Sequence, residues 1–336
     1  MSSTVLDWPC QIISSLSILF NLYLIYVYFR CPLRMVKSYK YFFLLTGIQN
    51  IVYSSCLFLL VPILFAENYS YMFVSTGPLR RQPGGQVLLV FFSLIFITSL
   101  LLVANSFIYR YLQVCKPHFF QRYLKPKYVY FVIVLNAVVV GNWAFIVCVA
   151  LWPSKGFIAD IGGMIAQTTG VKSLECAQVG FSLKYSVTPL NLFLIVELVI
   201  LMSLVATVMV QSGLSINRTL KRGAFSKSLR KLHQQMFALL LLQTACPFTF
   251  LHSPTFVAYV FLLAGLTAPV AVSYTITMLL TLFPFFAPIV IVLFLKDYRI
   301  YTFSGLQICR RKEATPAPSI FISGMRTNQV SELSGS

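Results

Sequence analysis

The feature that most constrains this chain is a long stretch without any charged residue. From 232 to 295, between Lys231 and Lys296, there is no Asp, Glu, Lys or Arg. Over the whole chain 58% of the residues are hydrophobic and 10% are charged, whereas a soluble domain has roughly 25% charged residues. This composition excludes an ordinary water-soluble fold, and it indicates that the lipid bilayer is the solvent.

The apolar runs are long enough to cross a bilayer as helices. A helix needs about 20 predominantly apolar residues to span a hydrocarbon core about 30 Å thick. The runs are near-continuous rather than alternating, which favours helices over a β-barrel. The sequence therefore predicts an all-α membrane protein, with one seven-helix transmembrane domain over residues 1–300. The expected spans are about 11–29, 41–65, 86–109, 129–152, 189–210, 235–258 and 270–295.

The positions of the basic residues predict the orientation, because Lys and Arg are retained on the cytoplasmic side. With the N-terminus outside, the inside segments 30–40, 110–128, 211–233 and 296–336 hold 4, 5, 6 and 6 of the 26 basic residues. We therefore expect an extracellular N-terminus and a cytoplasmic C-terminus. The pI near 9.7 reflects these cytoplasmic basic residues, which set the orientation and are attracted to anionic inner-leaflet lipid. A nucleic-acid partner is not needed to explain it. The segment 301–336 has no apolar periodicity, which predicts a disordered cytoplasmic tail.

A few residues in the loops are candidates for modification. Asn68-Tyr69-Ser70 is an N-glycosylation sequon in the first outside loop. Cys10 and Cys176 are both expected outside, where they could form a disulfide or remain two free thiols. Cys309 precedes Arg310-Arg311-Lys312 and is a candidate palmitoylation site.

The residues needed for catalysis, metal binding or ion pumping are missing. The chain has three histidines and no H-E-x-x-H motif, and Glu197 is the lone carboxylate within a span. The sequence therefore predicts no enzyme activity, no metal and no cofactor. A carboxylate at the bilayer centre costs roughly 3 kcal/mol on insertion scales, so we expect Glu197 to face the bundle interior. There it would either line a ligand pocket or form a hydrogen bond with a neighbouring helix.

A specific pattern lies at the inner end of the third span. Tyr109-Arg110-Tyr111 is followed by Cys115 and Pro117. This stretch resembles the Y-R-Y…C-x-P pattern of the nematode serpentine chemoreceptors of the Str and Srd-like classes, with Tyr109 where rhodopsin-like receptors carry an acid. Further segments resemble the same family in order: Ser38-Tyr39-Lys40-Tyr41, Trp143, Pro153, Gln234-Gln235-Met236-Phe237, Phe283-Pro284 and Lys296-Asp297-Tyr298-Arg299. The resemblance covers about 30–300.

The resemblance implies a chemosensory, olfactory-type G-protein-coupled receptor in the plasma membrane, expected in a sensory-neuron cilium. Such a receptor binds a small extracellular molecule and activates a heterotrimeric G protein. Its implied coupling surface comprises Tyr109, Arg110, Tyr111, Arg218, Lys221, Arg222, Lys227, Arg230 and Lys231. The alternative is a seven-span ligand-gated channel or carrier for a small molecule, which would place the N-terminus inside, as in some insect odorant receptors.

Prolines within the spans supply candidate hinges for such a receptor. Proline removes a backbone donor and kinks a helix, and a kink can pivot between two packings. The expected activation kinks are at Pro189, Pro247, Pro284 and Pro288.

Overall fold

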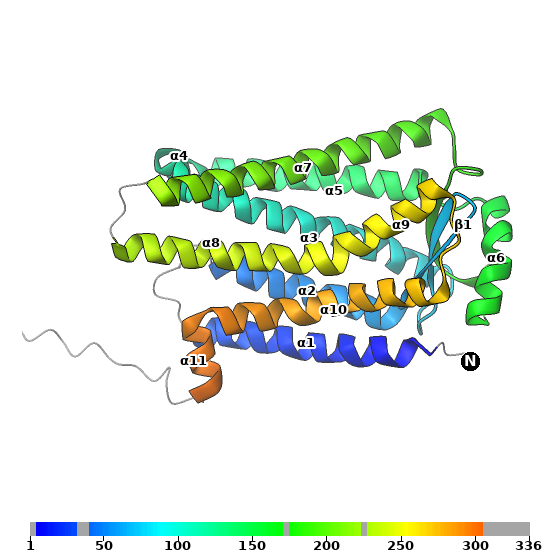
Figure 1. Cartoon of the computed structure of the whole chain (residues 1–336), viewed down its shortest axis with the longest axis horizontal. Coiled ribbons are helices and arrows are strands. Elements are labelled where there is room, and N and C mark those ends of the chain that lie inside the picture. The colour runs from blue at the N-terminus through cyan, green and yellow to red at the C-terminus, as the bar shows by residue number, and fades with distance from the viewer. Residues whose placement is uncertain (1–4, 32–39, 171–174, 223–226, 305–336) are drawn as a thin grey trace, which may run out of the picture.

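The computed structural model describes residues 5–31, 40–170, 175–222 and 227–304. Long helices lie side by side along the longest axis of the molecule (Figure 1). Within these residues, seven helical segments are long and apolar enough to cross a membrane, which confirms the predicted seven-helix architecture. They are α1 (Asp7–Arg30), α2 (Lys40–Leu60), α3 (Gly84–Cys115), α5 (Pro126–Val149), α7 (Pro189–Arg222), the segment His233–Ala264 within α8 to α9, and α10 (Val270–Phe294).

The two ends of the bundle differ in what covers them. One end carries a three-stranded sheet, α6 (Lys155–Thr169) and the beginning of α1, and we refer to it as the sheet end. The opposite end carries α4 (Pro117–Tyr123), α11 (Lys296–Ser304) and the facing ends of α7 and α8 (Figure 1). Because Arg110 lies near that end of α3, we refer to it as the Arg110 end.

The sheet is not among the elements expected from the sequence. The second span was expected to reach residue 65, but α2 ends at Leu60 and strand β1 (Pro62–Glu67) follows. Pro62 accounts for this end, because the residue before a proline is disfavoured in the α region, and Val61 has a φ of 40°. The chain then turns back through Asn68 and Tyr69, whose φ angles of 47° and 59° suit a tight hairpin turn.

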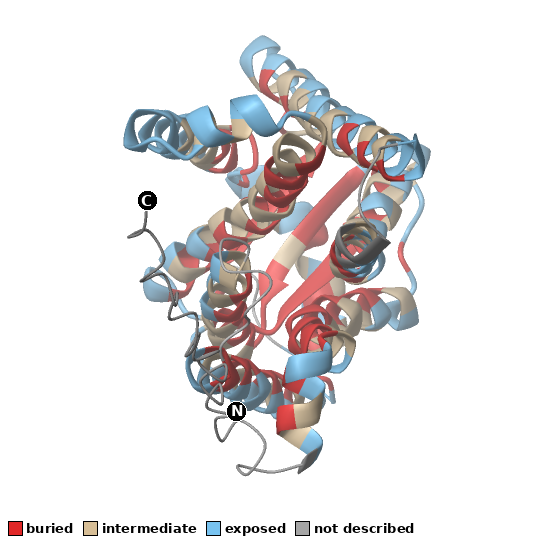
Figure 2. Ribbon diagram, turned by 90° about the vertical axis from the view of Figure 1, so that its left-hand side faces the viewer, coloured by how far each residue is buried: buried red, intermediate tan, exposed pale blue. Residues whose placement is uncertain are grey.

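The hairpin pairs with a third strand from a distant loop. β1 pairs antiparallel with β2 (Ser70–Ser75), and β2 pairs antiparallel with β3 (Gln178–Ser182), which comes from the loop between α6 and α7. In Figure 2, which looks along the bundle, the strands are almost entirely buried. The protein is thus mostly helical, with a buried sheet added at one end.

Both faces of this sheet are packed. Successive side chains of a strand point to opposite faces, so Leu64 and Tyr71 belong to the large apolar cluster within the bundle. Phe65 and Met72 point the other way, into a cluster that includes Phe157 and further residues of α6 and the beginning of α1. The sheet therefore forms a layer between the helical bundle and α6.

The helix bounds correct several other expectations. α7 continues to Arg222 and α8 (Lys227–Pro247) begins soon after, so most of the segment 211–233, expected as a loop, is helical. α11 also extends to Ser304, so the first residues of the expected tail 301–336 are helical. The rest of that tail, including Cys309, lies outside the described residues.

The four prolines do not share one structural role. Pro189 is the first residue of α7, a position where proline removes no helical hydrogen bond, so its assignment as a kink is wrong. Pro247 lies inside a helix, and a π-helix, η2 (Phe248–His252), follows it before α9 (Ser253–Ala264). Pro284 and Pro288 both lie inside α10.

Candidate functional site

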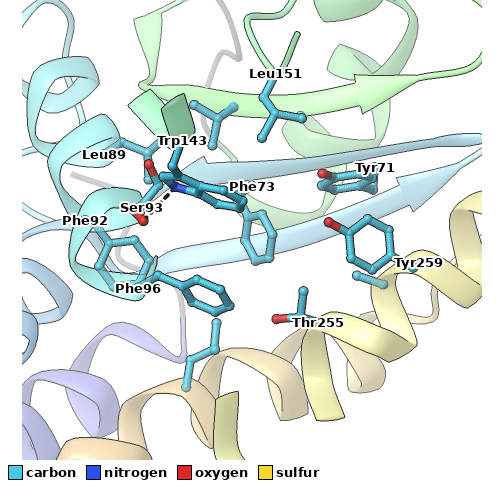
Figure 3. Close-up of a pocket in the computed structure, with 14 residues that line it drawn as sticks. Tyr71, Phe73, Leu89, Phe92, Ser93, Phe96, Trp143, Leu151, Thr255 and Tyr259 are labelled. Atoms are coloured by element: carbon cyan, nitrogen blue, oxygen red, sulfur yellow. Dashed lines mark hydrogen bonds between the residues drawn. The ribbon is translucent and has the colours of Figure 1, made fainter. Parts of the chain in front are cut away.

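A cavity lies directly beneath the sheet, within the bundle. Its volume is about 100 Å³. Side chains reach it from α3, α5, α9 and α10 and from the inner face of the sheet (Figure 3). It is lined by Tyr71, Phe73, Leu89, Phe92, Ser93, Phe96, Trp143, Leu151, Val179, Gly180, Thr255, Ala258, Tyr259 and Leu280.

Aromatic and aliphatic side chains dominate this lining, which contains no Asp, Glu, Lys, Arg or His. The Ser93 hydroxyl donates to the Val90 carbonyl oxygen of its own helix at 2.7 Å. The rings of Tyr71 and Tyr259 meet edge to face, with 5.9 Å between their centroids. Burial raises the pKa of Tyr71 well above its ordinary value, so its phenol stays neutral. Such a cavity suits a small, neutral and largely apolar molecule.

One of the residues that line the cavity packs against the π-helix η2. Phe96 lines the cavity, and its ring meets the His252 ring edge to face at 5.8 Å. The neighbouring Leu251 is fully buried in the same apolar cluster. The cavity is therefore in contact with the point where α8 gives way to α9, immediately after Pro247.

Glu197 is not among the residues that line the cavity. The Asn142 side-chain amide of α5 donates a hydrogen bond to its carboxylate at 2.8 Å. Of the two roles left open by the sequence, the structure therefore supports the bond between helices and not the pocket.

At the Arg110 end, the Tyr-Arg-Tyr motif joins α3 to its neighbours. Arg110 is buried, and one of its guanidinium nitrogens donates to the Gln113 side-chain oxygen at 2.8 Å. The Tyr109 ring packs edge to face on Phe42 at 5.4 Å and on Phe120 at 5.1 Å. Tyr109 also belongs to the same buried apolar cluster as Met236 and Leu239 of α8. The motif thus contacts α2, α4 and α8.

The basic residues expected to face a G protein gather at this same end. Arg218, Lys221 and Arg222 are exposed on the last turns of α7. Lys227, Arg230 and Lys231 lie on the first turns of α8, and Tyr111 packs against the apolar cluster between α3 and α7. Their role in coupling stays a prediction.

A buried polar cluster, whose members lie far apart in the sequence, links α1, α2 and α10. The Asn21 side-chain amide donates to the Pro284 carbonyl oxygen at 2.9 Å and to the Ser17 carbonyl oxygen at 2.8 Å. Asn50 donates to the Asn21 side-chain oxygen at 3.2 Å. In an α-helix the Pro284 carbonyl would accept from residue 288, which is a proline without an N–H. Asn21 therefore supplies the donor that Pro288 lacks.

The candidate modification sites lie at the sheet end. Asn68 is exposed in the hairpin turn, where its use as a glycosylation site stays a prediction. Cys10 and Cys176 are buried in the cluster between the sheet and α6, both as free thiols. The candidate disulfide is therefore not formed. Burial raises the pKa of the Cys176 thiol.

Comparison with known proteins gives a family match over most of the chain. Residues 9–303 match the family described as serpentine type 7TM GPCR chemoreceptor Str. The Caenorhabditis elegans protein named Serpentine receptor class r-10 is 24% identical over 291 residues, covering 84% of each chain. The Caenorhabditis briggsae protein of the same name is 23% identical over 291 residues, which cover 83% of this chain and 84% of that one. The C. elegans G-protein coupled receptor str-33 is 24% identical over 294 residues, with coverages of 83% and 84%.

Proposed function

Because this chain belongs to the Str family of serpentine seven-transmembrane chemoreceptors, we propose that it binds a small extracellular molecule at the sheet end and activates a heterotrimeric G protein at the Arg110 end. The family consists of G-protein-coupled chemoreceptors, which are not enzymes. Seven apolar helices make the chain a multi-pass membrane protein. In our proposal it resides in the plasma membrane of a sensory-neuron cilium, with the sheet end outside.

The observation that carries this proposal is the aromatic cavity beneath the sheet. Its lining is uncharged, and its hydroxyl groups, among them that of Tyr259, are few. An apolar cavity of 150 Å³ accommodates benzene, so a cavity of about 100 Å³ suits a ligand no larger than a few heavy atoms. The ligand would be neutral, mainly apolar and able to form a hydrogen bond with a tyrosine hydroxyl.

The π-helix provides a physical route from this cavity to the opposite end. π-Helical turns are rare and occur frequently at functional sites. A ligand that moves Phe96 would press on His252, which is part of η2. A change there would shift α8, whose Met236 and Leu239 pack in one apolar cluster with Tyr109 of the Tyr-Arg-Tyr motif. The exposed basic residues of α7 and α8 would then present a changed surface to the G protein.

The cavity can be tested with a pair of matched substitutions on α9. Ala258 is buried and lines the cavity, whereas Ala264 is exposed at the end of the same helix. In a cell-based screen for G-protein activation, Ala258→Leu should abolish the response to an agonist, while Ala264→Leu should respond as the unsubstituted receptor does. Both variants should reach the cell surface. An undiminished response of Ala258→Leu would refute the cavity as the ligand site.

Coupling is tested at the other end. Arg110→Ala should abolish G-protein activation while agonist binding and surface expression remain. Unchanged signalling would refute the role of Arg110. A ligand-evoked current that persists without a G protein would support the channel or carrier alternative.

A further inference from the structure

The sheet covers the cavity on the side that faces α6. Tyr71, Phe73 and Val179 line the cavity from the inner face of the sheet. On its other face, Met72 packs with Phe157 and further α6 residues. Figure 1 shows the same order of layers, with the sheet between the bundle and α6. A molecule arriving from water at this end would meet two packed layers before the cavity.

The edges of the sheet are fastened to the helices. On the β1 side, the backbone N–H of Ala268, in the loop between α9 and α10, donates to the Ala66 carbonyl oxygen at 2.9 Å. On the β3 side, the Gln86 side chain of α3 pairs with the Gln178 backbone, accepting from its N–H at 2.9 Å and donating to its carbonyl oxygen at 2.9 Å. Opening the sheet would break these bonds in a place largely hidden from water.

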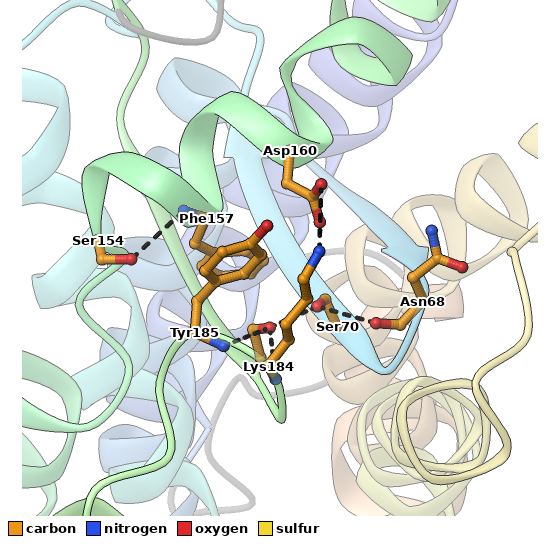
Figure 4. A network of polar contacts seen from close by, with 8 residues as sticks. Asn68, Ser70, Ser154, Phe157, Asp160, Lys184 and Tyr185 are labelled. Atoms are coloured by element: carbon orange, nitrogen blue, oxygen red, sulfur yellow. Dashed lines mark hydrogen bonds and ion pairs between the residues drawn. The ribbon is translucent and has the colours of Figure 1, made fainter.

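Polar contacts join two of the strands to each other and α6 to the loop after β3 (Figure 4). The Ser70 hydroxyl of β2 donates to the Ser182 hydroxyl of β3 at 2.7 Å. Just beyond β3, Lys184 lies 3.9 Å from the Asp160 carboxylate of α6. The sheet and α6 are thus connected to one another as well as to the bundle.

The cavity is covered differently on the side of α9. Thr255 and Tyr259 line it and are only partly buried. On the same helix, 68% of Phe256 and 70% of Leu263 is exposed, which for a membrane helix means contact with lipid. α7 contributes none of the lining residues, and the described elements packed most closely on α9 are β1, β2, η2 and α10. Side chains of one helix are therefore the main barrier between cavity and bilayer here.

From this arrangement we infer that the ligand reaches the cavity from the lipid bilayer, passing between α7 and α9. The inference rests on the proposed function, and it narrows the ligand class to neutral molecules that partition into membranes. A charged molecule would be excluded twice, first by its cost of entering the hydrocarbon and then by the uncharged lining of the cavity. Separating two helices in lipid breaks none of the hydrogen bonds that fasten the sheet.

The route can be tested by thiol accessibility, without a ligand or a G protein. Thr255→Cys places a thiol in the cavity, and Lys184→Cys places one in the exposed loop of the sheet end. Each variant is expressed at the cell surface and treated with a permanently charged methanethiosulfonate or with methyl methanethiosulfonate, which is small, uncharged and membrane-permeant. The unsubstituted chain, which has eight cysteines of its own, gives the background. Tyr259→Cys is a second cavity variant, should Thr255→Cys fail to reach the surface.

We expect the Lys184→Cys thiol to react readily with both reagents and the Thr255→Cys thiol to react readily only with the uncharged one. Relative to the loop thiol, the charged reagent should be about a hundredfold slower at the cavity thiol, which corresponds to the roughly 3 kcal/mol cost of a charge in the bilayer. Equal rates for the charged reagent at both thiols would overturn the inference in favour of an aqueous entrance. A cavity thiol that resists both reagents would overturn it as well. The thiol-accessibility results do not depend on an agonist or a G protein. A failure of the inferred entry route can therefore be distinguished from a failure of the proposed function, which the agonist and G-protein assays test.

Discussion

Asn21 offers the sharpest test of how the bundle is held together, because it replaces a hydrogen bond that proline removes. Its amide donates to the Pro284 carbonyl oxygen at 2.9 Å and its side-chain oxygen accepts from Asn50 at 3.2 Å. Asn21→Ala deletes both bonds between helices, leaving the Pro284 carbonyl without this donor. Pro288→Ala restores a backbone N–H one turn beyond Pro284 and so supplies a replacement. The two substitutions should therefore be strongly coupled.

The magnitude follows from the bonds that are lost. A buried group left unsatisfied costs about 1–3 kcal/mol in proteins generally, whereas bonds between membrane helices average about 0.6 and reach about 1.7 kcal/mol. With two such bonds removed, we expect Asn21→Ala to lower the free energy of unfolding by about 1–3 kcal/mol. In the Pro288→Ala background the loss should shrink by about 1 kcal/mol, since one of the two bonds then has a replacement.

The assay is reversible unfolding of the purified receptor in lipid–detergent mixtures, for the two single variants and the double variant. Asn105 provides a matched control. Its side-chain amide on α3 donates to the Asn136 side-chain oxygen of α5 at 2.9 Å, and this bond does not replace a backbone N–H that a proline lacks. Asn105→Ala should destabilise the receptor to a similar extent, and Pro288→Ala should not reduce that loss. Additive effects of Asn21→Ala and Pro288→Ala would refute the idea that Asn21 replaces the missing N–H.

Four further outcomes are expected at the sheet end. Cys10 and Cys176 should both be recovered by mass spectrometry as alkylated thiols after denaturation, and a disulfide-linked peptide would contradict the structure. Because the raised pKa of the Cys176 thiol keeps it protonated to higher pH, alkylation of Cys176 in the folded receptor, followed on its own peptide, should accelerate only above the pH at which an ordinary thiol ionises. Gly180→Ala should lower the free energy of unfolding by about 1–3 kcal/mol, since a Cβ there would collide with the backbone of β2. Gly141→Ala is the control, because a Cβ at that position meets open space and should be tolerated. Equal unfolding free energies for the two variants would show that β3 does not pack this closely on β2. Asn68→Gln should remove any glycosidase-sensitive mobility shift on a gel, and a shift that survives it would place the glycan elsewhere.

The sequence was sufficient for the number and approximate positions of the seven long helices and misleading for the sheet, for one physical reason. Spans were recognised by apolar length, and β1 is apolar enough to be read as the end of the second span, as the expected range 41–65 shows. Its period-2 alternation was hidden because both faces of the sheet are buried, so inward and outward residues are equally apolar. Pro62 and the turn at Asn68 were the available signals, since proline disfavours a helix at the residue before it and Asn tolerates a positive φ.

The candidate site was predictable only where it is local in sequence. The Tyr-Arg-Tyr segment around Arg110 could be recognised, because its residues are consecutive. The cavity could not, because Tyr71, Trp143 and Tyr259 come from a strand and two helices that only the fold brings together. Glu197 is a pocket candidate by sequence because it is the lone carboxylate in a span, but its carboxylate accepts a hydrogen bond from the Asn142 amide of α5 instead of lining the cavity. Pro189 was misread because a helix start and a helix interior look alike in an apolar run.

The π-helix after Pro247 also has a consequence for how such receptors diversify. Each residue of an α-helix advances the side-chain direction by about 100°, so inserting or deleting one residue in Phe248–His252 would rotate all of α9 relative to α8. Thr255 and Tyr259 would leave the cavity and the lipid-facing side chains would turn towards it, while α8 and its contacts near Arg110 kept their register. A single-codon insertion or deletion could therefore exchange the α9 side chains that line the cavity in one step, without changing any residue at the Arg110 end.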